Sequence, residues 1–371
     1  MKIAIVINTA WNIYNFRIGL IDFLESKGME VVTIAPEDDF SKKLAERVSY
    51  YPIYMDQKGT NPFSDLLLIF RLYNLYKKVS PDCILHYTIK PNIYGTLAAT
   101  MLGIPCINNV SGLGTVFLHN SLATRLAKLL YKISFKFPRK VFFQNQEDRS
   151  LFVNNKMVKL ANTDVLPGSG INLQTFRFEK LPDSYPFTFL VIARLLYDKG
   201  ILEFAQAAEV LKQKYTNTAF LLVGMLDGNP KLGVPKSLID SWCDAGVLQY
   251  LGFSSDVKKL ISKAHCVVLP SYREGTPRSL LEAAAMGRPI VTTNVPGCKE
   301  VVIDGYNGFL CQAGCAKDLA AKMEAMLQLA PSELNAMGQN SRELVENKFS
   351  EQLVLDKYFE VLNTLKLPRI D

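Results

Sequence analysis

The chain has 371 residues, of which 49% are hydrophobic and 21% charged. These are the proportions of a globular protein large enough for two domains, and they exclude a disordered or fibrous chain. No apolar run approaches about 18 residues, so a membrane-spanning helix is excluded, and the apolar run at the N-terminus is too short for a signal peptide. The seven cysteines form no C-x-x-C pair, which predicts reduced thiols in a cytoplasmic protein.

The net charge of +7 is concentrated in the first half of the chain. Residues 1–175 carry 20 Lys and Arg against 13 Asp and Glu, and no acidic residue occurs between Asp82 and Glu147. We therefore expect the first half to meet a large anionic partner.

Short apolar runs alternate with helix-length amphipathic runs from the first residues onward. The expected strands of the first half are 2–7, 31–35, 83–86, 106–109, 141–143 and 163–166, with helices such as 16–27 and 62–78 between them. Those of the second half are 187–193, 219–223, 248–251, 266–269 and 290–293. The alternation predicts an α/β fold with parallel sheets wrapped by helices.

A cluster of Gly and Pro at residues 166–186 marks the expected boundary between two doubly wound domains. We predict domains at 1–175 and 176–350, which face each other across a cleft. The segment 351–371 is expected to form a helix that crosses back to the first domain. Ligands of such sheets bind beyond the carboxyl ends of the strands.

The stretch ARLLYDKG places two cations after a predicted strand. Arg194 follows the strand, and Asp198 is placed to cap a helix that begins at Lys199. Lys199 would then lie at the positive end of the helix dipole, where a cation is disfavoured. A diphosphate bound between Arg194 and Lys199 would explain both cations; the alternative is a salt bridge from one of them to Asp198.

The stretch LPSYREGTPRSLLEAAAMGRPIV, residues 269–291, contains a strand end, a loop and a helix start. Thr276 and Pro277 fit the N-cap and the first turn of the helix, and Gly287 fits its end. The free N–H groups of Arg278 and Ser279 would then suit a phosphate.

Two glutamates flank this helix start. Glu274 precedes it and Glu282 lies roughly 7–9 Å further along the helix axis. Carboxylates bind vicinal hydroxyls well, so this separation suits one group near a sugar or phosphate and one near a ribose. The alternative is that Glu274 only favours the helix dipole and Glu282 is a solvated surface residue.

Several familiar motifs are missing. The sequence has no G-x-G-x-x-G after the first strand and no G-x-x-x-x-G-K-[ST], which argues against dinucleotide redox chemistry and P-loop hydrolysis. It also has no D-x-D motif and no His/Cys ligand cluster, so we expect neither a metal nor a cofactor. Arg194 and Lys199 would then stabilise the leaving group.

With these residues the chain resembles family 4 of the retaining glycosyltransferases, which have the GT-B architecture. The resemblance rests on Arg194 with Lys199, on Glu274-x7-Glu282, and on VVIDGYNGFL at 301–310. It implies that Arg194 and Lys199 bind the donor diphosphate and that Glu282 holds the ribose. It further implies that Glu274 contacts the donor sugar, as a catalytic residue with Arg194 and Lys199, and that the phosphates are lined by Gly275, Thr276 and Pro277.

The first half is similar to a narrower group of bacterial enzymes that extend undecaprenyl-diphosphate-linked sugars, among them N-acetylgalactosaminyltransferases. The matching stretches are NIYNFR at 12–17, IKPNIYG at 89–95 and SGLGTVF at 111–117. They supply the acceptor-side candidates Asn15, Lys90, Gly112 and Gly114. The resemblance implies a UDP-sugar donor, a lipid-linked saccharide acceptor and no nucleic acid partner.

The family mechanism is front-face transfer, in which the departing phosphate helps to deprotonate the acceptor and no enzymic nucleophile is needed. Two features depart from the family pattern. The loop after the first strand is NTAWNIYNF, not a glycine-rich loop, and neither His86 nor His119 lies in the family's usual histidine motif. We interpret His86 as a structural residue.

Residues 121–140 are predicted to form a basic amphipathic helix. One side would carry leucines and Phe137, and the other Arg125, Lys128, Lys132 and Lys136. Such a helix can rest in an anionic membrane interface; the alternative is an ordinary core-packed helix that is basic. We expect a cytoplasmic protein bound peripherally to the inner face of the cytoplasmic membrane.

Two other functions stay open from the sequence. One is a sugar-nucleotide epimerase on the same scaffold, which would need no acceptor. The other is a non-catalytic sugar-nucleotide-binding component of a polysaccharide assembly complex. The sequence does not identify the donor sugar; by resemblance the first candidate is N-acetylgalactosamine.

Overall fold

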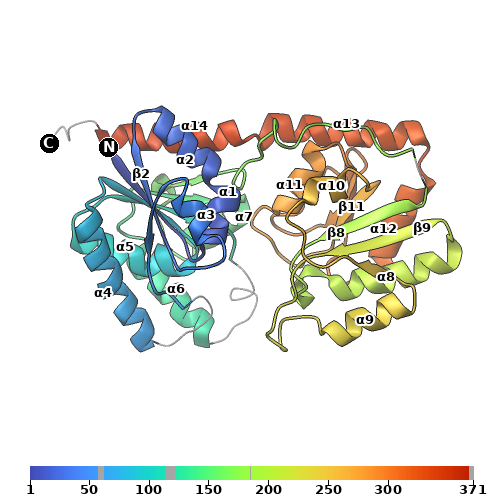
Figure 1. Ribbon diagram of the computed structural model, residues 1–371, viewed down its shortest axis with the longest axis horizontal. Helices are drawn as coiled ribbons and strands as arrows, with labels where there is room; N and C mark the ends of the chain where they lie inside the picture. The colour runs from blue at the N-terminus through green and yellow to red at the C-terminus, as the bar shows by residue number, and fades with distance from the viewer. Residues whose placement is uncertain (57–61, 114–121, 184, 367–371) are drawn as a thin grey trace. The chain divides into compact units, whose positions relative to one another are not determined.

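The computed structural model describes residues 1–56, 62–113, 122–183 and 185–366. The chain divides into two compact units (Figure 1). The first comprises Met1–Ser169 together with the chain from Glu351 onward, and the second comprises Gly170–Ser350. The change of unit after Ser169 lies a few residues before the boundary expected at residue 175.

The first unit contains a seven-stranded parallel sheet with strand order β3-β2-β1-β4-β5-β6-β7. Its strands are β1 (Lys2–Val6), β2 (Glu30–Ala35), β3 (Ser49–Pro52), β4 (Cys83–Tyr87), β5 (Cys106–Val110), β6 (Lys140–Phe143) and β7 (Thr163–Val165). Its helices are α1 (Ala10–Phe16), α2 (Ile18–Ser26), α3 (Ser41–Ala45), α4 (Pro62–Val79), η1 (Pro91–Gly95), α5 (Thr96–Met101), α6 (Leu122–Ser134), α7 (Gln146–Asn154), η3 (Leu160–Asn162) and α14 (Glu351–Lys366).

The second unit contains a six-stranded parallel sheet with strand order β10-β9-β8-β11-β12-β13. Its strands are β8 (Phe187–Ile192), β9 (Thr218–Val223), β10 (Gln249–Tyr250), β11 (Cys266–Leu269), β12 (Ile290–Thr293) and β13 (Gly308–Cys311). Its helices are η4 (Tyr197–Lys199), α8 (Ile201–Lys214), α9 (Lys236–Asp244), α10 (Val257–Ile261), α11 (Arg278–Ala285), α12 (Ala316–Gln328) and α13 (Pro331–Lys348).

In each sheet the first strand lies in the middle and later strands are added on both sides of it, so each sheet is doubly wound. β1 pairs with β2 and β4, and β8 pairs with β9 and β11. Apolar clusters bury both faces of each sheet, which explains why the central strands are continuous apolar runs and not alternating ones. The predicted α/β class with two parallel sheets is confirmed.

Two short edge strands, β3 and β13, were not predicted. The four residues of β3 are all partly or fully exposed, and β13 is half-exposed at its centre. Edge strands bury one side only and carry a weak apolar signal, so their residues resemble loop sequence.

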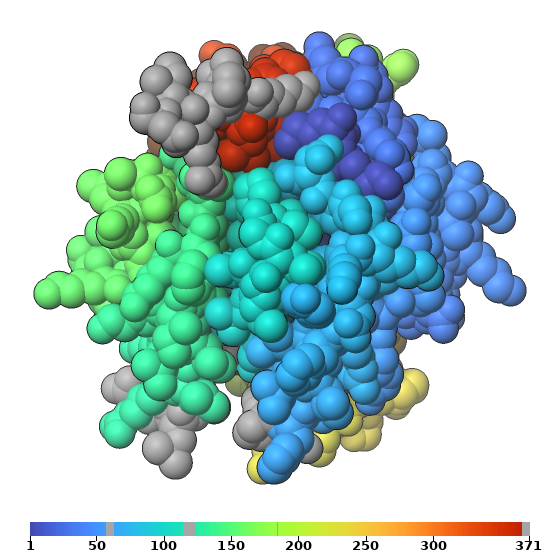
Figure 2. Space-filling model, turned by 90° about the vertical axis from the view of Figure 1, so that its left-hand side faces the viewer, coloured from blue at the N-terminus to red at the C-terminus, as the bar shows by residue number. Residues whose placement is uncertain are grey.

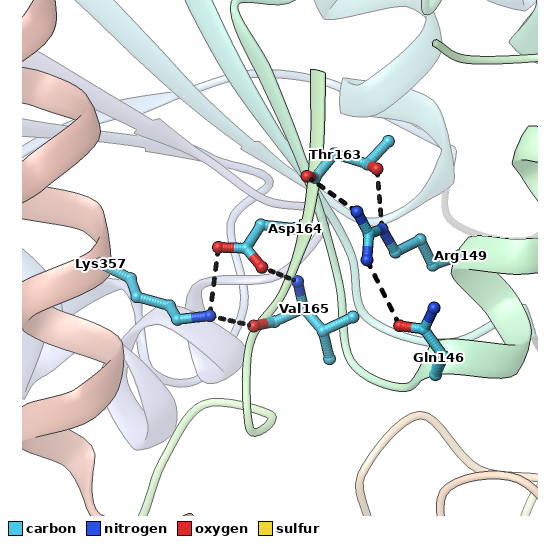
Figure 3. Close-up of polar contacts among 6 residues, drawn as sticks. All are labelled: Gln146, Arg149, Thr163, Asp164, Val165 and Lys357. Atoms are coloured by element: carbon cyan, nitrogen blue, oxygen red, sulfur yellow. Dashed lines mark hydrogen bonds and ion pairs between the residues drawn. The ribbon is translucent and has the colours of Figure 1, made fainter. Parts of the chain in front are cut away.

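The C-terminal helix α14 packs on the first unit (Figure 3). The Lys357 ammonium donates to the Asp164 carboxylate at 3.1 Å and to the Val165 carbonyl at 2.7 Å, which ties α14 to β7. On the other side of β7, the Arg149 Nε donates to the Thr163 hydroxyl at 2.8 Å. Val354, Leu355, Tyr358 and Leu362 of α14 are buried in the core cluster of β1 and β2.

All seven cysteines are free thiols, and five of them are buried. Burial raises the pKa of the Cys106 thiol to about 12, so this group is a packed core residue and not a reactive one. No helix in the described part of the chain combines the length and apolar character needed to cross a membrane.

His86 is completely buried in β4. Its Nε2 lies 3.0 Å from the Tyr76 hydroxyl and its Nδ1 lies 3.1 Å from the Asn108 side-chain oxygen. Burial lowers the pKa of His86 to about 3, although the Asn108 hydrogen bond opposes this shift. A buried neutral imidazole with both nitrogens occupied is what the structural interpretation of His86 predicts.

This lowered pKa makes stability depend on pH. The unfolded histidine gains a proton below about pH 6.5, whereas the folded one stays neutral down to about pH 3, so the contribution is full above pH 6.5 and is lost as the pH falls. Between pH 6 and pH 4 we expect His86 to remove about 1.4 kcal/mol of stability per pH unit. Urea unfolding at several pH values should show a shallower dependence for His86→Gln; equal slopes would contradict the assignment.

Candidate functional site

The candidate site of the second unit is built from loops at the carboxyl ends of β8, β11 and β12. Arg194 follows β8 and is exposed, and it makes no side-chain hydrogen bond or ion pair with any residue the structure describes. Its backbone is fixed, because the Leu196 N–H donates to the Arg194 carbonyl at 2.8 Å. Arg194 is therefore a cation available to a ligand.

Lys199 lies in the short turn η4 and is mostly buried. Its ammonium forms an ion pair with the Glu274 carboxylate at 2.5 Å, with 14% and 17% of the two side chains exposed. The predicted alternative, a salt bridge from Lys199 to Asp198, is therefore wrong. An ammonium has three donors, so Lys199 can hold Glu274 and still donate to a phosphate.

The expected cap by Asp198 is also wrong. The long helix α8 begins at Ile201, and its N-cap is Gly200 in a left-handed conformation with φ of 71°. A Cβ at Gly200 would lie 2.1 Å from the Pro270 carbonyl oxygen, so only glycine permits this approach. The Asp198 carbonyl instead accepts from the Tyr272 N–H at 2.8 Å, which joins the loops after β8 and β11.

Glu274 is held by the loop after β12. Its N–H donates to the Pro296 carbonyl at 3.1 Å. At Gly297, with φ of 87°, a Cβ would lie 2.4 Å from the Glu274 carbonyl oxygen. Gly200 and Gly297 were not predicted as site residues. The dipeptide Pro296-Gly297 after a strand is a turn signal that could have indicated Gly297.

The helix α11 begins one residue later than predicted. Pro277, in an extended conformation, is the N-cap and makes no side-chain cap, so the N-cap assignment of Thr276 is wrong. Proline has no N–H of its own to satisfy, and its carbonyl accepts from Leu280 at 3.1 Å. The predicted end of the helix is confirmed, because Gly287 has φ of 76° directly after the last turn.

Glu282 lies within α11 and is 8% exposed, so the alternative of a solvated surface residue is wrong. Burial raises the pKa of the Glu282 carboxyl, and the neighbouring Arg278 opposes this shift. The Arg278 Nε donates to Glu282 at 3.0 Å, and its Nη1 donates to the Gly170 carbonyl at 2.7 Å. The i,i+4 spacing of these two residues could have revealed the pair.

Two other titratable side chains, Tyr272 and Cys298, lie in the loops after β11 and β12 that also hold the Lys199–Glu274 pair. The Tyr272 hydroxyl donates to Glu203 at 2.6 Å, and burial with this bond raises the pKa of Tyr272 to about 12. Burial and the nearby Glu274 raise the pKa of the Cys298 thiol to about 12. Both side chains are therefore neutral at physiological pH and add no charge to the site.

Comparison with known proteins identifies the family. Residues 173–344 match the family described as glycosyl transferases group 1, and residues 2–145 match the family described as glycosyl transferase 4-like. The N,N'-diacetylbacillosaminyl-diphospho-undecaprenol alpha-1,3-N-acetylgalactosaminyltransferase of Campylobacter jejuni is 32% identical over 97% of this chain and 98% of its own length. The chain belongs to the group 1 glycosyltransferases.

One further relative and one solved structure extend the comparison. The glycosyltransferase is 26% identical to the UDP-Gal:alpha-D-GlcNAc-diphosphoundecaprenol alpha-1,3-galactosyltransferase of Escherichia coli, over 79% of this chain and 78% of that one. Its fold matches Anabaena HepE, solved in complex with UDP and glucose, with a TM-score of 0.79 at 18% identity over 98% of this chain and 100% of that one. The predicted GT-B fold, with two Rossmann-like domains, is confirmed.

The acceptor-side candidates of the glycosyltransferase lie in its first unit. Asn15 is exposed on α1 and donates to the Trp11 carbonyl at 2.8 Å. Lys90 is paired with Asp65 at 2.7 Å, and both side chains are largely buried. Gly112 follows β5 with φ of 119°, and Gly114 lies outside the described residues, as does His119.

Proposed function

We propose that this glycosyltransferase moves a hexose or N-acetylhexosamine from a UDP-sugar to a polyprenyl-diphosphate-linked saccharide, with retention and without a metal. The observation that carries the proposal is the Lys199–Glu274 pair at the carboxyl edge of the sheet, together with Arg194 at the end of β8, whose side chain has no partner among the described residues. By their names, the C. jejuni and E. coli relatives are both alpha-1,3-glycosyltransferases that act on diphospho-undecaprenol-linked sugars. N-acetylgalactosamine is the first candidate for the donor sugar.

In this proposal the donor diphosphate binds Arg194 and Lys199. Glu274 accepts hydrogen bonds from the sugar hydroxyls, and the phosphates lie along the loop of Gly275, Thr276 and Pro277. Glu282 binds the ribose hydroxyls at the far end of the donor.

The transfer breaks the bond between the anomeric carbon and the β-phosphate oxygen. The acceptor hydroxyl forms the new bond on the same face of the sugar, and its proton passes to the departing phosphate, so UDP leaves. Negative charge develops on the diphosphate as the old bond breaks, and Arg194 and Lys199 are placed to stabilise it. These two cations would perform the task that a divalent metal performs in other transferases.

The role of Glu282 is tested by Glu282→Gln. Loss of a charge-assisted hydrogen bond should weaken UDP binding by about tenfold or more, measured by isothermal titration calorimetry. The matched control is Glu346→Gln, because Arg342 and Glu346 form another i,i+4 pair in the same unit. Unchanged UDP affinity in Glu282→Gln would show that Glu282 serves only to hold Arg278.

The first unit supports contact with an anionic membrane. The helix α6 ends at Ser134, earlier than predicted, because residue 137 precedes Pro138 and the helical conformation is disfavoured there. Tyr131 of the helix and Phe135 directly after it are buried in the core of the unit. A separate apolar row stays exposed beside the lysines: Leu126 (49%), Leu129 (54%), Ile133 (44%) and Phe137 (47%). The alternative of an ordinary core-packed helix leaves this row unexplained.

A second exposed row lies on α4, which the sequence analysis did not identify. Phe63, Leu66, Leu67 and Phe70 are each more than half exposed and follow one face of the helix by their spacing. The single acid of this helix, Asp65, is buried against Lys90 and Tyr94. Figures 1 and 2 show α4 and α6 reaching the same end of the unit. We include both helices in the membrane contact, at the inner face of the cytoplasmic membrane, where the lipid-linked acceptor would be found.

The function is tested with a panel of UDP-sugars and a short-chain prenyl-diphosphate N-acetylhexosamine acceptor. UDP release should require the acceptor and should be unaffected by a chelator, and the NMR coupling constant of the product should show retention of the anomeric configuration. A new sugar nucleotide formed from donor alone would favour an epimerase. Tight UDP-sugar binding without turnover across a panel of lipid acceptors would favour a binding protein.

A further inference from the structure

Arg17, at the junction of α1 and α2, is a buried cation without a counter-charge. It is 5% exposed, and its guanidinium lies 4.3 Å from the centre of the Tyr87 ring. Its buried Nε has no hydrogen-bond partner, and among the described residues Arg17 forms no ion pair. Buried arginines are normally paired, because the loss of hydration costs several kcal/mol. Stacking on Tyr87 offsets only part of that cost.

A second unsatisfied donor lies against Arg17. The hydroxyl of Tyr87 is buried and makes no hydrogen bond of normal length and angle with any residue the structure describes, although the Tyr358 hydroxyl lies near enough for a weak one that helps to raise the pKa of Tyr87. Tyr87 is the last residue of β4, so both groups lie at the carboxyl edge of the sheet, the edge at which ligands of doubly wound domains bind. The guanidinium lies over the Tyr87 ring, its Nε lacks an acceptor, and the Tyr87 hydroxyl has no well-formed hydrogen bond, so the positive charge of Arg17 favours an anionic acceptor here.

The surroundings are polar and rigid. The ring of Tyr358, from α14, lies 6.3 Å from the Tyr87 ring, and the Tyr358 hydroxyl accepts from the Asn109 amide at 2.9 Å. Asn109 in turn accepts from the Ser111 hydroxyl at 3.1 Å. Ser111 is partly exposed, so this chain of hydrogen bonds leads from the buried tyrosines to the surface beyond β5.

No acidic side chain forms an ion pair with Arg17 among the described residues. The segment from Cys83 to Gln146, which supplies β4 and β5, contains no Asp or Glu. The carboxylate of Glu351 lies against Gly19, two residues beyond Arg17, yet it forms no ion pair with Arg17. Arg17 therefore has no ion-pair partner among the described residues, and the one carboxylate named nearby, that of Glu351, has interactions elsewhere.

We infer that Arg17 and the Tyr87 hydroxyl bind a phosphate oxygen of the acceptor, in a site of the first unit separate from the donor residues. The identification of this phosphate as part of a lipid-linked diphosphate rests on the proposed function. The inference that the site binds a phosphate is independent of it. Arg17 supplies charge and directional donors, Tyr87 fixes the guanidinium plane, and α14 closes the cluster through Tyr358.

Calorimetry tests the site directly. With saturating UDP present to occupy the donor residues, the enzyme is titrated with inorganic diphosphate and, separately, with a short-chain prenyl diphosphate. Arg17→Gln should weaken the binding of both compounds about ten- to a hundredfold. The affinity of Arg17→Lys should lie between those of the wild type and Arg17→Gln. Arg47→Gln removes an exposed arginine of the same unit and should bind as the wild type does. Tighter binding of the prenyl compound would identify the lipid-linked diphosphate as the source. Absence of binding, or equal affinity in Arg17→Gln, would overturn the inference and indicate that water fills the site.

Thermal unfolding separates a binding role from a structural one. Without anion, Arg17→Met should melt at or above the wild-type temperature, because it removes an uncompensated buried charge. A lowered melting temperature in Arg17→Met would mean that Arg17 stabilises the fold. In the transfer assay, Arg17→Gln should raise KM for the acceptor at least tenfold with KM for the donor unchanged. If the wild type transfers no sugar, the proposed function fails, and the calorimetry still decides the inference about the site.

Discussion

Replacing Arg194 by methionine should lower turnover about a hundredfold or more and leave the melting temperature unchanged. Removal of one pre-positioned donor to a developing oxyanion costs about 10²–10³ in kcat, and Arg194 is exposed with no side-chain partner in the described chain. Its loss should therefore disturb the reaction and not the fold. UDP-release kinetics and thermal unfolding of the same preparation measure the two effects.

Lys199 and Glu274 should behave differently, because they neutralise each other in a mostly buried pair. Lys199→Met and Glu274→Gln should each abolish most turnover and also destabilise the protein, by up to about 3–5 kcal/mol, since one charge is left without its partner. The double variant removes both charges. It should recover much of the stability and none of the activity.

The control for these single and double variants is the exposed pair Lys236–Asp240, whose side chains are 63% and 47% exposed. Its double replacement should alter neither stability nor turnover appreciably. Normal turnover by Glu274→Ala would remove Glu274 from the site. Activity recovered in the Lys199→Met, Glu274→Gln double variant would show that the pair only supports the loops.

The sequence predicted the central strands well because burial on both faces leaves a continuous apolar run. The limits of β11 and β12 agree with the prediction at both ends. One error near the site lies where a contact between distant loops decides the local conformation. α8 starts at Ile201 because Gly200 packs closely against the Pro270 carbonyl. The sequence around residue 200 does not indicate a contact with a residue seventy positions away.

The structure corrects the pairings expected for the candidate site residues, and their roles stay predictions. Arg194 and Lys199 were expected to share an anion or to pair with Asp198, whereas Lys199 pairs with Glu274 and Arg194 has no side-chain partner in the part of the chain that the structure describes. Arg17 ends the NIYNFR stretch that carries part of the resemblance, but it was not chosen as a site candidate, because an arginine between two short helices resembles a surface residue. Its burial depends on Tyr87 and on the distant helix α14, and sequence spacing carries no trace of either.

Replacing Leu126, Leu129 and Ile133 by serine should abolish most binding of the enzyme to liposomes. These side chains are exposed in the folded protein, and each buried methylene contributes about 0.8 kcal/mol to membrane binding. Their combined loss should weaken partition by at least about a hundredfold without lowering the melting temperature, since the core contacts of Tyr131 and Phe135 remain. Liposome flotation measures the partition.

Charge is tested separately, with Lys128, Lys132 and Lys136 replaced by glutamine. About 1 kcal/mol per lysine predicts a loss of roughly a hundredfold on vesicles with anionic lipid and little change on neutral ones. The matched control carries the same change of charge at the exposed residues Lys27, Lys42 and Lys43 of the same unit and should bind as the wild type does. If neither α6 variant differs from this control, the exposed row does not contact lipid. If the α6 variants lose binding yet turn over a water-soluble short-chain acceptor normally, α6 recruits the enzyme to the membrane and takes no part in the chemistry.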